Sequence, residues 1–175
     1  MAVDKETGTT SAKSGTTVER TSDRELTVTR LVNGPAHLVF KAWTTPELFK
    51  RWWSPRSSGV VMASQEMDIR VGGRYRLVFN FQRDGAPVTF AATGKYLEVT
   101  PSSRLVWTSD ESEAGESIST ATFEEQGGKT LLIVREVYPS KEALDAAFSS
   151  GGMVAGTRET FDQLDEFIVE LAAKA

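Results

Sequence analysis

The sequence predicts an α+β domain in which a curved antiparallel sheet of about seven strands wraps around a long C-terminal helix. Two observations predict this class. Short segments of alternating apolar and polar residues, separated by glycine and proline turns, fill much of the chain between residues 25 and 138. Beyond residue 138 the apolar residues instead recur every three or four positions, which is the period of a helix.

Composition and charge exclude several classes of function. The chain has 175 residues and a net charge of −4, so it has no electrostatic attraction to phosphate backbones and we expect no nucleic-acid partner. It contains no cysteine and one histidine, His37, which excludes cysteine and multi-histidine metal sites. We expect no cofactor, because no phosphate-binding loop or dinucleotide fingerprint is present. We expect no membrane span, because no run is apolar and long enough, and without a signal peptide the expected location is cytoplasmic.

Residues 1–22 are predicted to be a disordered tail, and residues 23–175 a single folded domain. The tail is rich in Thr, Ser, Gly and Lys and has almost no large apolar residue, so burial cannot offset the entropy cost of ordering it. Residues 25–32 then alternate with a period of two, which predicts the first strand. Asn33-Gly34-Pro35 ends that strand.

Two short helices are predicted after the first strand. Pro35 suits the first turn of a helix, and the apolar residues that follow it have helical spacing. Thr45-Pro46-Glu47 begins the second helix, with Thr45 as the cap and Pro46 at the first position. Ser54-Pro55 ends it.

The middle of the chain is predicted to be a meander of six strands. Asp84-Gly85 is a strong hairpin signal because a tight turn there needs positive φ angles. Gly72-Gly73 and Gly127-Gly128 mark two further turns. The predicted strands are residues 60–71, 74–81, 88–99, 104–109, 117–125 and 129–138.

The last element is predicted to be a long amphipathic helix that covers the sheet. It begins near Ser140, is interrupted at Gly151-Gly152 and continues almost to the C-terminus. A curved sheet around one helix tends to leave a gap between them, and such gaps bind small ligands. The apolar stripe of the helix comprises Thr157, Thr160, Phe161, Leu164, Phe167, Ile168 and Leu171.

Several segments resemble, in order, the signatures of the family of homologues of the activator of the heat-shock protein 90 ATPase. The resemblance runs from about Glu25 to Ala173 without large gaps, so it is more specific than a single short motif. The segments are Ala42-Trp43-Thr44-Thr45-Pro46-Glu47, Arg51-Trp52-Trp53-Ser54-Pro55, Asp68-Ile69-Arg70-Val71-Gly72-Gly73, Gly94-Lys95-Tyr96-Leu97-Glu98-Val99, Arg104-Leu105-Val106, Phe123-Glu124-Glu125 and Gly156-Thr157-Arg158-Glu159-Thr160.

This family belongs to the START-like superfamily, also called SRPBCC, so the resemblance implies a helix-grip fold with a cavity rather than a particular reaction. Relatives in the superfamily bind lipids, sterols, polyketides or hormones, and a minority are cyclases or components of hydroxylating systems. Eukaryotic co-chaperones of the family carry a further N-terminal chaperone-binding domain. Nothing before Glu25 matches that domain, so we expect no chaperone partner.

A set of aromatic side chains is the main candidate for a ligand site. In a helix-grip fold we expect them to line a cavity for a small apolar or amphipathic molecule, because rings bury a large area at low cost in side-chain entropy. Ordinary core packing is the alternative. The adjacent Trp52 and Trp53 cannot both face inward, so we expect one of them at the entrance. The candidates, completed by a methionine, are Trp43, Trp52, Trp53, Tyr75, Phe79, Phe81, Phe90, Tyr96, Trp107 and Met153.

Two charged residues, Arg70 and Glu136, are candidates for anchoring a polar group of the ligand. Glu136 shares a strand face with Leu132 and Val134, which are predicted to face the core. A buried acid needs a partner, because an isolated buried charge is costly. A structural ion pair among Asp68, Arg70 and Glu136 is the alternative interpretation.

Ligand binding without catalysis is the predicted function, and two alternatives stay open. An enzyme of the polyketide cyclase or aromatase type would use Arg70, Tyr75, Tyr96 or Glu136 to orient and protonate its substrate, and would show several titratable groups converging on one cavity. A protein-interaction module, such as a chaperone cofactor, would expose an apolar patch outside the cavity. A homodimer is compatible with the sequence and not required by it.

Overall fold

A computed structural model describes residues 15–110, 113–149 and 152–174. In these residues eight strands form one antiparallel sheet in the order β1-β2-β8-β7-β6-β5-β4-β3. The strands are β1 (Thr16–Arg20), β2 (Glu25–Val32), β3 (Val61–Met67), β4 (Arg74–Arg83), β5 (Ala86–Thr100), β6 (Arg104–Ser109), β7 (Ser117–Gln126) and β8 (Lys129–Val137).

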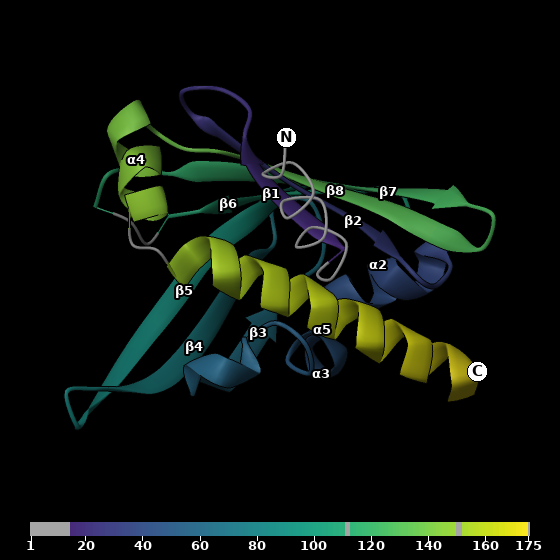
Figure 1. Ribbon diagram of the computed structural model, residues 1–175, viewed down its shortest axis with the longest axis horizontal. Helices are drawn as coiled ribbons and strands as arrows, with labels where there is room; N and C mark the ends of the chain where they lie inside the picture. Colours follow the sequence, from purple (N-terminus) through teal and green to yellow (C-terminus); the bar gives the residue numbers. More distant parts are fainter. Residues whose placement is uncertain (1–14, 111–112, 150–151, 175) are drawn as a thin grey trace, which may run out of the picture.

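The helices gather on one face of this sheet. Figure 1 shows α5 crossing the sheet, with α2 and α3 beside its C-terminal half and α4 near the end where it begins. The helical elements are α2 (Ala36–Thr44), α3 (Pro46–Phe49), the 3₁₀ turn η1 (Arg56–Ser58), α4 (Lys141–Ser149) and α5 (Gly152–Lys174). This arrangement confirms the predicted helix-grip fold.

Local sequence signals account for most of the element boundaries. The tight turn between β4 and β5 has positive φ at both central residues, 52° at Asp84 and 79° at Gly85, as the hairpin signal predicts. Thr45 occupies the N-cap position of α3 but forms no side-chain cap hydrogen bond. The strand predicted over residues 60–71 ends earlier, at Met67, because the chain turns there through Asp68 to Gly73.

The prediction of a disordered tail over residues 1–22 is wrong for Thr16–Arg20. These residues form strand β1, which pairs with β2 and gives the sheet its eighth strand. Side chains from the C-terminal helices hold it at both ends. Thr16 donates a hydrogen bond to Asp162 of α5 over 3.1 Å, and Arg20 forms an ion pair with Asp145 of α4 at 2.6 Å. Residues 1–14 lie outside the described residues.

A cluster of charges fastens α5 to the sheet beside β1. Arg30 of β2 forms ion pairs with both Asp162 and Asp165 of α5, and its side chain is only 12% exposed. Asp165 also accepts a hydrogen bond from the backbone N–H of Asn33 over 2.6 Å. Removing one partner from such a half-buried cluster leaves a poorly solvated charge, so the cluster fixes the position of the helix.

The apolar core lies between α5 and the inner face of the sheet. Leu164 and Ile168 of α5 are completely buried, as is Leu132 on β8. The chain between β2 and α2 approaches so closely that a β-carbon on Gly34 would lie 2.3 Å from Cγ2 of Ile168. Close packing at this end of α5 leaves no free space there, and the empty space lies at the other end of the helix.

Candidate functional site

A cavity of about 490 Å³ lies between the sheet and the N-terminal half of α5. Its floor is the inner face of strands β2, β8, β7, β6, β5 and β4, and its roof is formed by Gly152 to Phe161 of α5 together with the segment that follows α3. Most of its lining is aromatic or aliphatic. The volume falls in the range of pockets that enclose small organic ligands.

One row of side chains crosses the floor of the cavity from strand to strand. The register places Leu26 of β2 opposite Glu136 of β8, Glu136 opposite Ser119 of β7, and Ser119 opposite Trp107 of β6. Trp107 in turn lies opposite Tyr96 of β5. All five line the cavity. Because directly opposed residues share a face of a sheet, the pairing of these strands aligns an apolar, an acidic, a hydroxyl and two aromatic side chains.

Several polar groups of the cavity are hydrogen-bonded to one another or to the backbone, whereas the buried indole N–H of Trp43 has no partner among the described residues. Glu136 accepts hydrogen bonds from the hydroxyl of Ser119, at 3.4 Å, and from that of Tyr138. The hydroxyl of Tyr75 donates to the carbonyl oxygen of Thr108 over 2.6 Å, so Tyr75 is held in one orientation. The Glu136 carboxylate is the one charged group in the described lining.

Two tyrosines of the cavity have raised pKa values. Burial raises the pKa of Tyr138 above its ordinary value, and the neighbouring Glu136 carboxylate raises it further. Burial also raises the pKa of Tyr96, with smaller contributions from Tyr75 and Asp68. Both phenols are therefore neutral at physiological pH and act as hydrogen-bonding groups.

The entrance lies between the N-terminus of α5 and the hairpin of β4 and β5. Phe90 of β5 lines the cavity and is 45% exposed, and its ring stacks on that of Phe79 at a centroid distance of 6.5 Å. Gly152, also exposed, and Met153 face it from the start of α5. Phe90 and Gly152 are thus the lining residues that are exposed to solvent, whereas Glu136 and Tyr138 are half-buried.

The comparison with known families decides the family. The family model described as Activator of Hsp90 ATPase homolog 1-like protein matches residues 33–168, which is more than half of the chain. The chain belongs to this family. No curated protein matches it.

Solved structures of similar proteins share the fold of this family member. A protein from Rhodobacter sphaeroides is 25% identical, with a TM-score of 0.76 over 90% of this chain and 98% of its own. A protein from Nitrosomonas europaea is 22% identical, with a TM-score of 0.75 over 88% and 99%. An AHSA1-like protein from Aeromonas hydrophila is 19% identical, with a TM-score of 0.62 over 85% and 94%. The fold is in general a scaffold for ligand binding.

The structure brings nine of the twelve predicted site residues together around the cavity. Their side chains come from α2, the segment after α3, four strands and α5, so the fold joins residues that are far apart in the sequence. Of the two adjacent tryptophans, Trp53 lines the cavity and Trp52 does not. The nine are Trp43, Trp53, Tyr75, Phe79, Phe90, Tyr96, Trp107, Glu136 and Met153.

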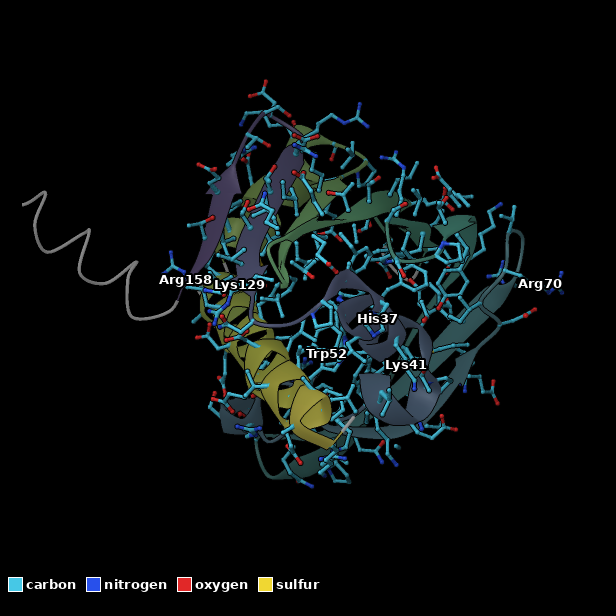
Figure 2. The ribbon with its side chains drawn as sticks, turned by 90° about the vertical axis from the view of Figure 1, so that its right-hand side faces the viewer. His37, Lys41, Trp52, Arg70, Lys129 and Arg158 are labelled. Carbon is cyan, nitrogen blue, oxygen red and sulfur yellow. The ribbon has the colours of Figure 1, made fainter. Side chains whose placement is uncertain are left out.

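Three predicted site residues, Trp52, Arg70 and Phe81, do not line the cavity. Trp52 is fully buried in the core, where its indole N–H donates to the carbonyl oxygen of Ala42 over 3.1 Å. Arg70 lies in the turn after β3 and projects from the edge of the molecule, where it pairs with Asp68 at 2.9 Å (Figure 2). Arg70 therefore neither reaches the cavity nor forms the ion pair with Glu136 that the sequence left open.

Phe81 misses the cavity because the hairpin of β4 and β5 extends past it. Its ring is half-buried and lies under the guanidinium of Arg83, 5.7 Å from the ring centroid. The alternation of β4 correctly places Phe81 on the same face as Tyr75, Leu77 and Phe79. Alternation gives the face of a strand but not the point along it where the cavity ends.

Sequence reasoning missed several lining residues. Tyr138 lies two positions after Glu136, and strand alternation could have placed both on one face. Ser119 depends on the pairing of β7 with β8, and Gly156 on which turn of α5 faces the void. Of these, only Tyr138 carried a signal that can be read along one strand.

Two further observations concern the predictions about metal sites and membrane spans. Residues 15–110, 113–149 and 152–174 contain no group of three or more His, Asp or Glu side chains that could hold a metal ion. No helix in the same ranges is long and apolar enough to cross a membrane.

Proposed function

We propose that the protein binds a small, largely apolar molecule in the cavity between the sheet and α5, and does no chemistry on it. The observation that carries the proposal is the cavity itself, which is roomy, open at one end and lined mainly by aromatic and aliphatic side chains. A void with such walls is costly to maintain in a protein interior, where side chains normally pack closely. Occupation by an apolar molecule would recover the lost contacts.

The protonation properties of the cavity favour binding over catalysis. A general acid works best when its pKa lies near the operating pH. The pKa values of Tyr96 and Tyr138 are instead raised by burial, away from neutrality. Tyr75, the third tyrosine of the cavity, already donates its proton to the Thr108 carbonyl.

A neutral fluorescent probe tests the proposal. N-phenyl-1-naphthylamine is apolar and uncharged, and its emission rises when it enters an apolar site. We expect saturable binding to the folded protein, with energy transfer from Trp43, Trp53 and Trp107, which line the cavity. Native mass spectrometry of freshly purified protein would also detect a co-purified ligand.

A matched pair of phenylalanine substitutions separates a cavity from a packed core. Phe79 and Phe40 are both 9% exposed, but only Phe79 lines the cavity, whereas Phe40 packs edge-on against Phe123 at 5.4 Å. Phe79→Trp should keep the stability and lose the probe, because the larger ring enters empty space. Phe40→Trp should lose about 1–3 kcal/mol and keep the probe. A wild-type protein that binds no probe, together with a destabilised Phe79→Trp variant, contradicts the proposal.

A second candidate function is a cyclase-type reaction on a bound polyketide. One observation favours it: Glu136, Tyr138, Tyr75 and Tyr96 all line the same open cavity. The two candidates differ in what happens to the ligand. Recovery of a co-purified ligand with unchanged mass and unchanged fragmentation after incubation supports binding alone. Loss of water, or the altered fragmentation that a ring closure causes at constant mass, supports the enzyme.

The remaining alternative, an interaction module, has less support from the surface. Large apolar side chains are exposed on β2, β3, β5, β7, β8 and α5 and in the turn before β4. Ile118 and Val137 form a directly opposed pair on β7 and β8. Exposed apolar residues spread over many elements in this way are usual for a folded domain.

A further inference from the structure

Part of the roof of the cavity is formed by residues 52–57, here called the roof segment, which lie between α3 and β3. Two of these residues, Trp53 and Pro55, line the cavity. The indole of Trp53 stacks on the ring of Phe49 at a centroid distance of 4.8 Å. The roof segment contains no strand and no α-helix, so its backbone N–H and C=O groups need other partners. Side chains of α5 supply several of them.

One of these side chains, Gln163, bonds to three backbone groups of the roof segment. Its amide nitrogen Nε2 donates to the carbonyl oxygens of Trp52 and Ser54, each over 2.9 Å. Its Oε1 accepts a hydrogen bond from the N–H of Arg56 over 2.8 Å. Gln163 is 4% exposed and does not line the cavity. Burying an amide is costly unless it is hydrogen-bonded, so these three bonds are what stabilise Gln163 in this place.

Two further side chains of α5 hold the same segment. The hydroxyl of Thr160 donates to the carbonyl oxygen of Trp53 over 3.0 Å. The carboxylate of Glu159 accepts hydrogen bonds from the hydroxyl and the backbone N–H of Ser57, the latter over 2.9 Å. The roof segment is therefore fastened to α5 by side-chain bonds along its whole length, and Gln163 provides the most of them.

We propose that Gln163 is a positioning residue of the ligand site, which holds Trp53 and Pro55 where they meet the ligand and thereby sets the affinity of the cavity. This inference rests on the proposed binding function and adds a residue that acts on binding without touching the ligand. A binding site needs such supporting bonds, because walls that move lose the geometry that the ligand requires. Without Gln163 the roof segment would sample other positions, and the apparent affinity would fall with the fraction of binding-competent molecules.

Loss of these bonds should loosen the roof segment without detaching it. Trp52, at its start, is fully buried, and its indole N–H donates to the carbonyl oxygen of Ala42 over 3.1 Å. Glu159 still holds Ser57 at the other end. The middle of the segment, which carries the lining residues, would therefore lose its support while both ends stay attached.

A matched pair of variants tests the inference with the full chain at pH 7. Gln163→Met keeps the approximate size of the side chain and removes all three bonds. If the competent position of the roof segment falls to about one fifth of the population, the Kd of N-phenyl-1-naphthylamine rises about fivefold, and we expect at least this change. Thr130→Val removes another buried bond, which the Thr130 hydroxyl donates to the carbonyl oxygen of Gly34 over 2.8 Å, at a position that does not line the cavity. This control should lose stability but keep the Kd within about twofold, because the two sites share no partner.

Urea unfolding followed by circular dichroism shows that each variant is folded before the probe is titrated. A folded Gln163→Met variant that binds the probe like the wild type overturns the inference. An equal rise of the Kd in both variants also overturns it, because lost stability alone would then explain the effect.

A measurement on the wild type keeps the inference testable should Gln163→Met not fold. The backbone N–H of Arg56 should be protected from hydrogen exchange by its bond to Gln163. Exchange of this N–H as fast as in an unfolded chain overturns the inference while the binding function stands. Absence of probe binding in the wild type overturns the proposed function itself, and the inference with it.

Discussion

Replacing Gly156 with alanine should stabilise the protein, although the residue lines the cavity. Gly156 lies inside α5, where glycine costs about 0.5–1 kcal/mol relative to alanine because it loses more conformational freedom on folding. A β-carbon placed there would meet Cγ of Pro55 at 3.6 Å, which is an ordinary van der Waals contact. We therefore expect the free energy of unfolding to rise by about 0.5–1 kcal/mol and the Tm by roughly 1–4 °C.

Two other glycines serve as controls for this prediction. Neither has a positive φ, and at both positions there is no space for a β-carbon. A β-carbon on Gly94 would lie 1.9 Å from the carbonyl oxygen of Thr108, and one on Gly34 would lie 2.3 Å from Ile168. Gly94→Ala and Gly34→Ala should both destabilise, Gly94→Ala more, since a backbone atom cannot move aside as a side chain can. Urea unfolding followed by circular dichroism measures all three. A Gly156→Ala variant less stable than the wild type would refute the reasoning.

Three further perturbations test the fold around the site. Phe161→Ala, which removes a ring that is 4% exposed and contacts Trp43, should cost about 3–5 kcal/mol in urea unfolding, and a near-neutral result would contradict the placement of α5. Deleting residues 1–21 removes β1 and should lower the free energy of unfolding by more than about 1 kcal/mol. The control is a shorter truncation that keeps β1, and equal stability of the two variants would refute the role of β1. Hydrogen bonds from Thr93 and Arg74 lower the pKa of Asp110, so its carboxylate stabilises the fold at neutral pH. The difference in unfolding free energy between the wild type and Asp110→Asn should therefore vanish as the pH falls below about 3.9. A difference that persists in acid would argue against this role of the carboxylate.

Much of the sheet could be predicted because its signals are local. β6 occupies the predicted residues 104–109, bounded by a turn before it and a loop after it. The hairpin at Asp84-Gly85 is specified by two residues that tolerate positive φ. Alternation within each strand then selects the face that carries the rings, since one-residue shifts would turn every ring outward.

β1 could not be predicted because the contacts that order it lie far away in the sequence. Its five residues include one large apolar side chain, Val18, so composition alone describes a tail. The hydrogen bond from Thr16 to Asp162 spans 146 positions, and the ion pair from Arg20 to Asp145 spans 125. Such tertiary contacts offset the entropy of ordering the strand, and no local pattern announces them.

Most of the predicted site residues line the cavity, but the ends of the strands that carry them were not all predicted. Arg70 shows why this matters. Periodicity placed it in a strand that continues to residue 71 and left open an ion pair with Asp68 and Glu136 as an alternative. The strand ends at Met67 instead, and the following turn brings Gly73 so close to Asp68 that a β-carbon would lie 2.0 Å from its carbonyl oxygen. Arg70 consequently lies on the outside of a tight turn, so a boundary error of four residues removed a candidate ligand anchor.

The position of the cavity follows from the distribution of side-chain volume along α5. The C-terminal half of the helix presents Leu164, Phe167 and Ile168 to the sheet, and these are at most 7% exposed. The first turns of the helix instead present Gly152, Gly156 and Thr157 at the same interface, with Met153 as the one large side chain among them. Gly156 lies inside the helix and costs stability that alanine would restore, whereas Gly152 is the first residue of the helix. Glycine at position 156, at the roof of the cavity, is expected if the space has a use, because locally unfavourable residues occur mainly where function requires them.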